Sequence, residues 1–261
     1  MDTLQSILLG IVQGLTEFLP VSSSGHLQLA KELLGVELEQ NVTFDVTLHA
    51  ATVLSTIVVM WHEIVRILKG LFSRTLNDEQ AYALKIILSM IPAGVVGLLF
   101  AERIEALFSS LLVVGFMLLL TAALLAFAYY AKPRRKESIS YRDAFLIGCA
   151  QAVATMPGLS RSGSTIATGL LLGNNKESVA HFSFLMVIPV ILGKMLLDLL
   201  SGEMAAMPVG TLPLIAGFLS AFVVGALACR FMIDIVKRGK LIWFAWYCAA
   251  AGLLSIAGTL L

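Results

Sequence analysis

Long apolar runs constrain this chain more than any other feature. Of its 261 residues, 58% are hydrophobic and 13% are charged, whereas a soluble domain carries about 25% charged residues. The runs lack the alternation of an outer-membrane strand, so helices must satisfy the backbone hydrogen bonds. The sequence predicts an all-α polytopic integral membrane protein. Six runs approach the roughly 20 residues that a crossing helix needs, at residues 46–61, 86–101, 107–131, 182–200, 212–231 and 241–261.

Two further apolar segments, at about residues 4–34 and 144–173, are interrupted in the middle by proline, glycine and serine. The first interruption reads QGLTEFLPVSSSGH over residues 13–26, and the second reads PGLSRSGST over residues 157–165. Each half of such a segment is too short to cross a bilayer. We therefore expect each segment to form a re-entrant helical hairpin that enters the membrane and turns back.

The two interrupted segments are related by an internal repeat. Shifting the chain by 138 residues gives nine identities over residues 7–35, against two or three expected by chance. Each half then consists of a re-entrant hairpin followed by three transmembrane helices, and an odd number of crossings inverts the second half. The predicted units are residues 1–131, a basic linker at 132–143, and residues 144–261. Inverted repeats place polar sites near the bilayer midplane, where the halves meet.

The positions of basic residues predict the orientation of this inverted repeat. Loops rich in lysine and arginine lie on the cytoplasmic side. Six crossings alternate correctly with three such loops, which places both termini outside. The loop residues are Arg66, Lys69, Arg74 and Lys85; Lys132, Arg134, Arg135, Lys136 and Arg142; and Arg230, Lys237, Arg238 and Lys240.

Gln13 and Glu17 lie four residues apart and share one face of a helix. A carboxylate at membrane depth costs about 2.5–3.5 kcal/mol, so an unpaired, lipid-facing Glu17 is not expected. One interpretation is structural, with Glu17 bonded to a neighbouring backbone or to Arg161. The other is functional, as a general acid or base or as a metal ligand, since carboxylate and amide oxygens suit hard divalent cations.

The serine triplet follows Pro20, which cannot continue the first short helix. Ser22, Ser23 and Ser24 offer hydroxyls and exposed N–H groups at a helix start, an arrangement that binds anions. A serine triplet alone indicates only a turn, and a lone His26 is usually a satisfied buried histidine. Together, however, serine and histidine provide a nucleophile and a proton donor or acceptor.

Arg161 is the most informative single residue of the second interruption. A guanidinium at membrane depth requires a partner, and its planar fork matches a phosphate group. A salt bridge to Glu17 across the interface between the halves is the structural alternative, and the two interpretations are compatible. The neighbouring hydroxyls would add donors to a bound phosphate, from Ser160, Ser162 and Thr165.

These two interruptions resemble the motifs of the undecaprenyl-diphosphate phosphatase family, also called BacA or UppP. The first family motif is Glu/Gln-xxx-Glu followed by Pro-Val-Ser-Ser-x-Gly-His, and the second is Pro-Gly-x-Ser-Arg-Ser-xx-Thr. Both occur here in order, and the length, hydropathy and repeat agree along the whole chain. In one departure, Gln13 stands where many members carry glutamate, which leaves one carboxylate fewer for a cation.

The resemblance implies a hydrolase that converts a polyprenyl diphosphate lipid to the monophosphate and inorganic phosphate. Ser23 or His26 would attack the terminal phosphorus, while Arg161 and the serine and threonine hydroxyls hold its oxygens. Glu17 with Gln13 would position Mg²⁺ or Ca²⁺ or activate the attacking group. The family's site opens to the extracytoplasmic face of the bacterial cytoplasmic membrane.

The resemblance also implies recycling of the lipid carrier of peptidoglycan synthesis and bacitracin resistance. We expect a bilayer and a lipid substrate as partners but no nucleic acid, and the oligomeric state is left open. A different class of function is also compatible with inverted repeats, namely a transporter or flippase for a phosphorylated lipid. A scaffold without chemistry is a third, less favoured class, because buried arginine and glutamate are costly to keep idle.

Overall fold

The computed structural model describes residues 1–36, 42–73, 75, 77–108, 110–131, 136–200 and 209–260. Arg74, Lys132, Arg134 and Arg135 of the predicted basic loops lie outside these residues. Over the described ranges the chain forms eleven helices: α1 (Thr3–Phe18), α2 (Ser23–Leu33), α3 (Val42–Val59), α4 (Trp61–Leu71), α5 (Asp78–Phe108), α6 (Leu111–Tyr130), α7 (Tyr141–Val153), α8 (Arg161–Leu171), α9 (Lys176–Leu200), α10 (Thr211–Arg238) and α11 (Ile242–Leu260).

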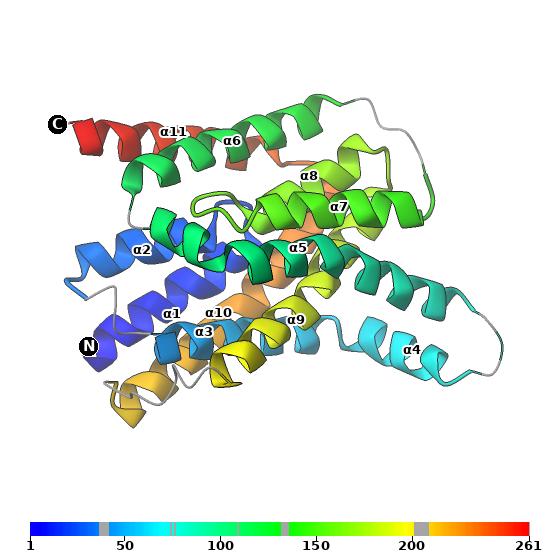
Figure 1. Ribbon diagram of the computed structural model, residues 1–261, viewed down its shortest axis with the longest axis horizontal. Helices are drawn as coiled ribbons and strands as arrows, with labels where there is room; N and C mark the ends of the chain where they lie inside the picture. Colours follow the sequence, from blue (N-terminus) through cyan, green and yellow to red (C-terminus); the bar gives the residue numbers. More distant parts are fainter. Residues whose placement is uncertain are drawn as a thin grey trace.

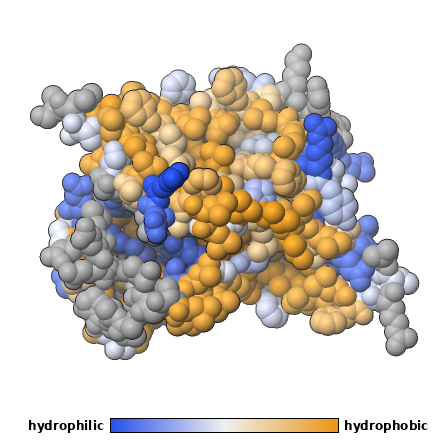
Figure 2. Space-filling view, viewed as in Figure 1, coloured by the Kyte–Doolittle hydropathy of each residue, from blue (hydrophilic) through white to orange (hydrophobic). Residues whose placement is uncertain are grey.

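Five of these helices are long and apolar enough to cross a membrane, namely α5, α6, α9, α10 and α11. A sixth crossing results if α3 and α4 count as one broken span, since they meet at an angle of 79°. Apolar side chains cover the middle of the molecule, and hydrophilic ones gather towards its two ends (Figure 2). The all-helical membrane fold predicted from the sequence is therefore confirmed.

Both predicted hairpins are present as pairs of short helices. Helices α1 and α2 contain 16 and 11 residues, and α7 and α8 contain 13 and 11. The two members of a pair are each shorter than the roughly 20 residues needed for a crossing. Helices α2 and α8 begin and end at positions related by the 138-residue shift of the repeat. Inversion of the second half relative to the membrane remains a prediction.

The two termini lie at one end of the molecule, and the end of α4 and the start of α5 lie at the other (Figure 1). The end of α6 and the start of α7 also lie at that second end (Figure 1). Two of the three predicted basic loops are thus on the side away from the termini. This arrangement is the one that the charge distribution predicts for two external termini.

Glycines allow the first hairpin to pack closely against α10. A methyl group at Gly14 of α1 would lie 2.8 Å from the carbonyl oxygen of Ala221 and from the backbone nitrogen of Gly225. Small residues at such crossings let helix backbones approach within a membrane, where packing replaces the hydrophobic driving force. Helix α7 similarly packs on α5, where Gly148 faces the backbone of Ser89. These close contacts hold the first hairpin against α10 and the second against α5.

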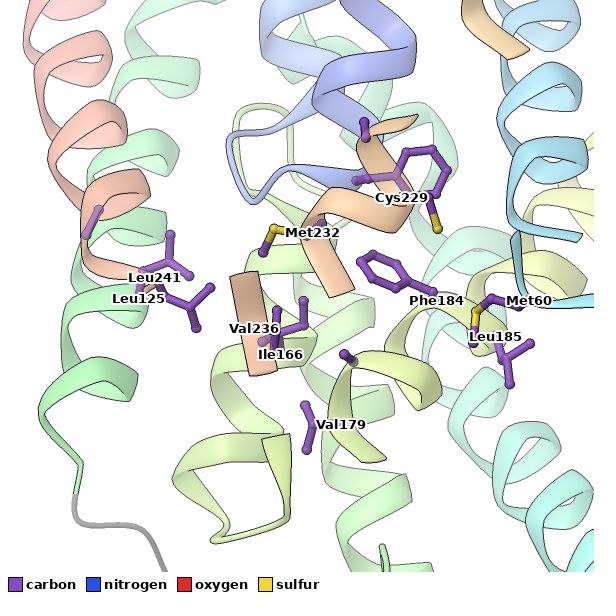
Figure 3. Packing of buried hydrophobic residues seen from close by; sticks show 14 of the residues in the cluster. Met60, Leu125, Ile166, Val179, Phe184, Leu185, Cys229, Met232, Val236 and Leu241 are labelled. Carbon is purple, nitrogen blue, oxygen red and sulfur yellow. The ribbon is translucent and has the colours of Figure 1, made fainter. Parts of the chain in front are cut away.

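The largest apolar cluster takes buried residues from seven helices, namely α1, α4, α6, α8, α9, α10 and α11 (Figure 3). Ile166 of α8 packs there with residues of α9 and α10, and Leu125 and Leu241 extend the cluster towards α6 and α11. Phe18, the last residue of α1, meets Phe184 of α9 edge-to-face with ring centroids 5.7 Å apart. The ends of α1 and α8 are therefore anchored in the same core, which brings the two hairpin turns together.

Candidate functional site

The turns of the two hairpins touch each other inside the bundle. The Ser162 hydroxyl donates to the carbonyl oxygen of Leu19 over 3.2 Å. A methyl group at Gly163 would lie 3.2 Å from Pro20, and one at Gly25 would lie 3.5 Å from Gly158. Residues about 140 positions apart in the sequence thus form one compact polar region, as the repeat predicts.

Arg161 and Glu17 form an ion pair across this contact. Arg161 Nη2 donates to Glu17 Oε1 over 2.5 Å, and the two side chains are only 16% and 7% exposed. Gln13 Nε2 donates to Glu17 Oε2 over 3.0 Å, so both carboxylate oxygens are engaged. The salt bridge weighed from the sequence is therefore present, and it joins the two halves of the chain.

Two buried polar atoms of this group lack partners. Arg161 Nη1 and Gln13 Oε1 make no hydrogen bond to any described residue. A buried donor or acceptor left unsatisfied costs about 1–3 kcal/mol, so such atoms usually indicate an unseen water, ion or ligand. Arg161 in particular keeps one nitrogen of its fork free for an anion.

Two helix N-termini lie at this contact between the turns. Ser22 caps α2 by accepting from the backbone nitrogen of Gly25 over 3.4 Å, and Ser160 caps α8 by accepting from Gly163 over 3.0 Å. Each N-terminus carries the positive end of a helix dipole. With Arg161 at the start of α8 and Glu17 as the opposing carboxylate, the region favours an anionic ligand.

Ser22 is the single described non-glycine residue with a positive φ, at 73°. Such a conformation costs about 1–3 kcal/mol for a residue with a side chain, and it persists where surrounding contacts enforce it. It turns the chain sharply between Pro20 and the start of α2. As a result Ser23, the first residue of α2, lies close enough to the Glu17 carboxylate to interact with it.

His26 is directed elsewhere. Its Nδ1 lies 2.9 Å from the carbonyl oxygen of Ser22, and its Nε2 lies 2.7 Å from the hydroxyl of Tyr247 in α11. Both ring nitrogens are thus occupied, and neither bonds Ser23 or Glu17. Sequence reasoning did not identify Tyr247, because a contact over 221 positions has no local pattern.

The remaining predicted hydroxyls have two different roles: some lie at the helix N-termini, and Thr165 makes structural contacts. The hydroxyl oxygens of Ser22 and Ser24 lie 3.3 Å apart at the start of α2. The hydroxyl oxygens of Ser160 and Ser162 lie 3.3 Å apart at the start of α8. Thr165 is fully buried and donates to the carbonyl oxygen of Arg161 over 2.9 Å. Its hydroxyl also meets that of Ser183, in α9, over 2.6 Å. In this state Thr165 holds the start of α8 in place.

Asp45 and His49 lie one turn apart on α3. Asp45 pairs with the buried Lys31 of α2 over 2.7 Å, which fastens the first hairpin to α3. His49 Nδ1 contacts the Asp45 carbonyl oxygen over 2.8 Å. Neither the ion pair of Lys31 nor the role of Ser183 was predicted.

The donor set is suited to a hard divalent cation at one position. The described residues contain no group of three histidine, cysteine or acidic side chains. However, Mg²⁺ is commonly held by one or two protein oxygens and completes its shell with water and substrate phosphate. Two such oxygens would be Gln13 Oε1, which has no hydrogen-bond partner, and an oxygen of the neighbouring Glu17 carboxylate.

These features define a class: a multi-pass helical membrane protein with a buried ion pair and two helix N-termini where its two hairpin turns meet. The chain belongs to the BacA family, because the family model described as "Bacitracin resistance protein BacA" matches residues 6–254. It is 61% identical over 265 residues to the undecaprenyl-diphosphatase of Parabacteroides distasonis, with 100% of both chains covered. It is 58% identical to that of Bacteroides fragilis and 37% identical to that of Methanosphaera stadtmanae, with 98% of each chain covered in both comparisons.

Proposed function

We propose that this protein is an undecaprenyl-diphosphate phosphatase, which hydrolyses the lipid diphosphate to undecaprenyl phosphate and inorganic phosphate. One observation carries the proposal: two helix N-termini and a half-free arginine converge on a buried point with a single carboxylate. Such a point has an excess of positive charge at membrane depth, where a phosphorylated lipid head would be the matching ligand. The membership of the BacA family and the names of its full-length relatives support the same activity.

Arg161 and the two turns would bind the terminal phosphate. The free Nη1 of Arg161 donates to a non-bridging oxygen, and backbone N–H groups with the hydroxyls of Ser22, Ser24, Ser160 and Ser162 supply further donors. These donors stabilise the charge that spreads over the equatorial oxygens in phosphoryl transfer. Thr165 contributes indirectly, by fixing the backbone of Arg161.

Ser23 is the nucleophile that the geometry favours over His26. It lies against Glu17, whereas both nitrogens of His26 are engaged by other groups. The Ser23 oxygen attacks the terminal phosphorus while its proton passes to Glu17, and the bond between phosphorus and the bridging oxygen breaks to release the lipid monophosphate. Glu17 then passes this proton to the departing lipid monophosphate. Water attacks the phosphoserine, Glu17 accepts a proton from that water and donates it to the Ser23 oxygen as the bond between phosphorus and that oxygen breaks, and inorganic phosphate and free Ser23 are formed.

A divalent cation, Mg²⁺ or Ca²⁺, belongs to this proposal. Gln13 Oε1 and a Glu17 oxygen would hold it, and it would supply additional positive charge to the bound diphosphate. Because Glu17 also pairs with Arg161, its carboxylate would be shared between a bound cation and the guanidinium. The chain's own contribution is to keep the oxygen of Gln13 free of other hydrogen bonds.

We place the protein in the bacterial cytoplasmic membrane, with the site opening to the extracytoplasmic face. Support comes from the two termini at the end opposite the α4–α5 connection, whose basic residues favour the cytoplasmic side (Figure 1). There the enzyme would regenerate the lipid carrier of peptidoglycan synthesis. Depletion of the diphosphate lipid would also confer resistance to bacitracin.

Phosphate release from undecaprenyl diphosphate by purified protein in detergent tests the function. Wild-type protein should release phosphate, and Arg161→Ala should lower kcat about 10²–10³-fold, the usual loss for a removed transition-state donor. Arg103→Ala removes an exposed arginine of α5 and should retain wild-type activity as the matched control. No phosphate release by folded wild-type protein, with intact substrate moving to the opposite leaflet of proteoliposomes, would establish a transporter instead.

A further inference from the structure

The tautomer of His26 follows from its two contacts. A carbonyl oxygen only accepts, so Nδ1, 2.9 Å from the Ser22 oxygen, carries a hydrogen and donates it. In the neutral ring Nε2 is then an acceptor, and the Tyr247 hydroxyl donates to it over 2.7 Å. The two rings also stack, with centroids 5.5 Å apart and planes inclined by 21°. The Ser22 carbonyl oxygen thus fixes the tautomer of the imidazole, and Tyr247 holds the plane of its ring.

Helix α11 contacts the first hairpin turn through two consecutive residues. Next to Tyr247, the buried Cys248 donates its thiol hydrogen to the carbonyl oxygen of Pro20 over 3.4 Å. Tyr247 thus contacts the turn at His26, and Cys248 contacts it at Pro20. The strained Ser22 lies between these two contacts.

The chain of contacts from Tyr247 ends at the residue before the proposed nucleophile. The Ser22 carbonyl accepts from both the backbone nitrogen of His26, over 3.2 Å, and its Nδ1. A double acceptor of this kind holds the peptide between Ser22 and Ser23 in one orientation. Ser22 has a positive φ at this peptide, and the next residue, Ser23, interacts with the Glu17 carboxylate.

We propose that Tyr247 is a positioning residue for the phosphatase reaction, which orients His26 and through it the Ser22–Ser23 peptide. This inference rests on the proposed function and adds to it a residue from the last helix, outside both hairpin motifs. Tyr247 touches neither the Arg161–Glu17 pair nor the expected phosphate. Its effect should therefore appear in the rate of the chemical step and not in substrate binding.

The test compares Tyr247→Phe with Tyr130→Phe, which removes the hydroxyl of an exposed tyrosine at the end of α6. Tyr247→Phe keeps the stacked ring and loses only the hydrogen bond. We expect its kcat to fall about tenfold with KM unchanged, the loss of one oriented hydrogen bond. Tyr130→Phe should match the wild type in both parameters. A kcat for Tyr247→Phe equal to that of the wild type would overturn the proposal.

The ring nitrogens of His26 provide a readout that a general loss of stability would not change. The chain has four histidines, so histidine-selective ¹⁵N labelling and His26→Gln identify the signals of His26 by NMR. The Nε2 signal should move in Tyr247→Phe and stay in place in Tyr130→Phe. A lower kcat with unmoved His26 signals would show that Tyr247 acts only on the fold. Absence of phosphate release by the wild-type protein would instead refute the proposed function.

Discussion

The buried pair of Arg161 and Glu17 allows the energetic balance of the site to be predicted. Its side chains are 16% and 7% exposed and come from opposite halves of the chain. Removing one member of such a pair leaves the other charge buried without compensation, at a cost of about 3–5 kcal/mol. Replacing both by neutral groups removes the attraction together with the desolvation penalty, and is often close to neutral.

We therefore expect Glu17→Gln and Arg161→Met each to lower the free energy of unfolding by about 3–5 kcal/mol. Gln keeps the shape of Glu17 and its contact with Gln13, and Met keeps the length of the arginine stem. The double variant should lie within about 1–2 kcal/mol of the wild type, so the coupling between the two sites exceeds about 3 kcal/mol.

Reversible unfolding in mixed micelles, followed by tryptophan fluorescence, measures the four free energies of this cycle. Phosphate release measured on the same samples separates stability from function, because the double variant should regain stability and remain inactive. Losses that simply add in the double variant would show that the two charges are independently solvated. The inference of a shared, dry pocket would then be wrong.

Two further predictions concern the scaffold and the cation. Gly14→Ala should lower the free energy of unfolding by about 1–3 kcal/mol, because its methyl group would meet the backbone of α10 at 2.8 Å. Gly94→Ala is the control: nothing lies within 4 Å of the added methyl group, so this variant should be neutral or slightly stabilising in the same unfolding assay. Chelation with EDTA should abolish phosphate release and added Mg²⁺ should restore it, and Gln13→Glu should lower the Mg²⁺ concentration for half-maximal activity, since a second carboxylate strengthens the site. Activity that persists without free divalent cations, or a Gln13→Glu variant with an unchanged requirement, would exclude the proposed cation ligands.

The hairpins and their meeting point could be predicted because their signals are local or repeated. Pro20 ends the first short helix, the serines cap the next, and the 138-residue repeat supplies the same pattern around Arg161. A buried charge of each sign in two related turns then implies that the turns face each other. These inferences need only the cost of polar groups in a membrane and the symmetry of the chain.

Other features depended on contacts that leave no pattern in the sequence. The predicted first crossing, at residues 46–61, corresponds to α3, but the 79° bend into a separate α4 was not anticipated. The residues that form α4 mix charged and apolar side chains, so they do not form the long apolar run that predicts a crossing. The bonds of Tyr247 to His26 and of Ser183 to Thr165 connect separate helices, and they depend on how those helices pack.

The repeat explains why two similar turns make one site and not two. Ser23 and Arg161 occupy the same position, as the first residue of α2 and of α8, and the counterpart of Glu17 in the second half is Thr155. In the proposed mechanism the first half thus contributes a hydroxyl and a carboxylate, and the second contributes the guanidinium that would hold a phosphate. Had both halves kept a carboxylate, two negative groups would surround the phosphate and repel it. Because the related positions carry different charges, the two similar turns can form one proposed phosphate site with a defined orientation.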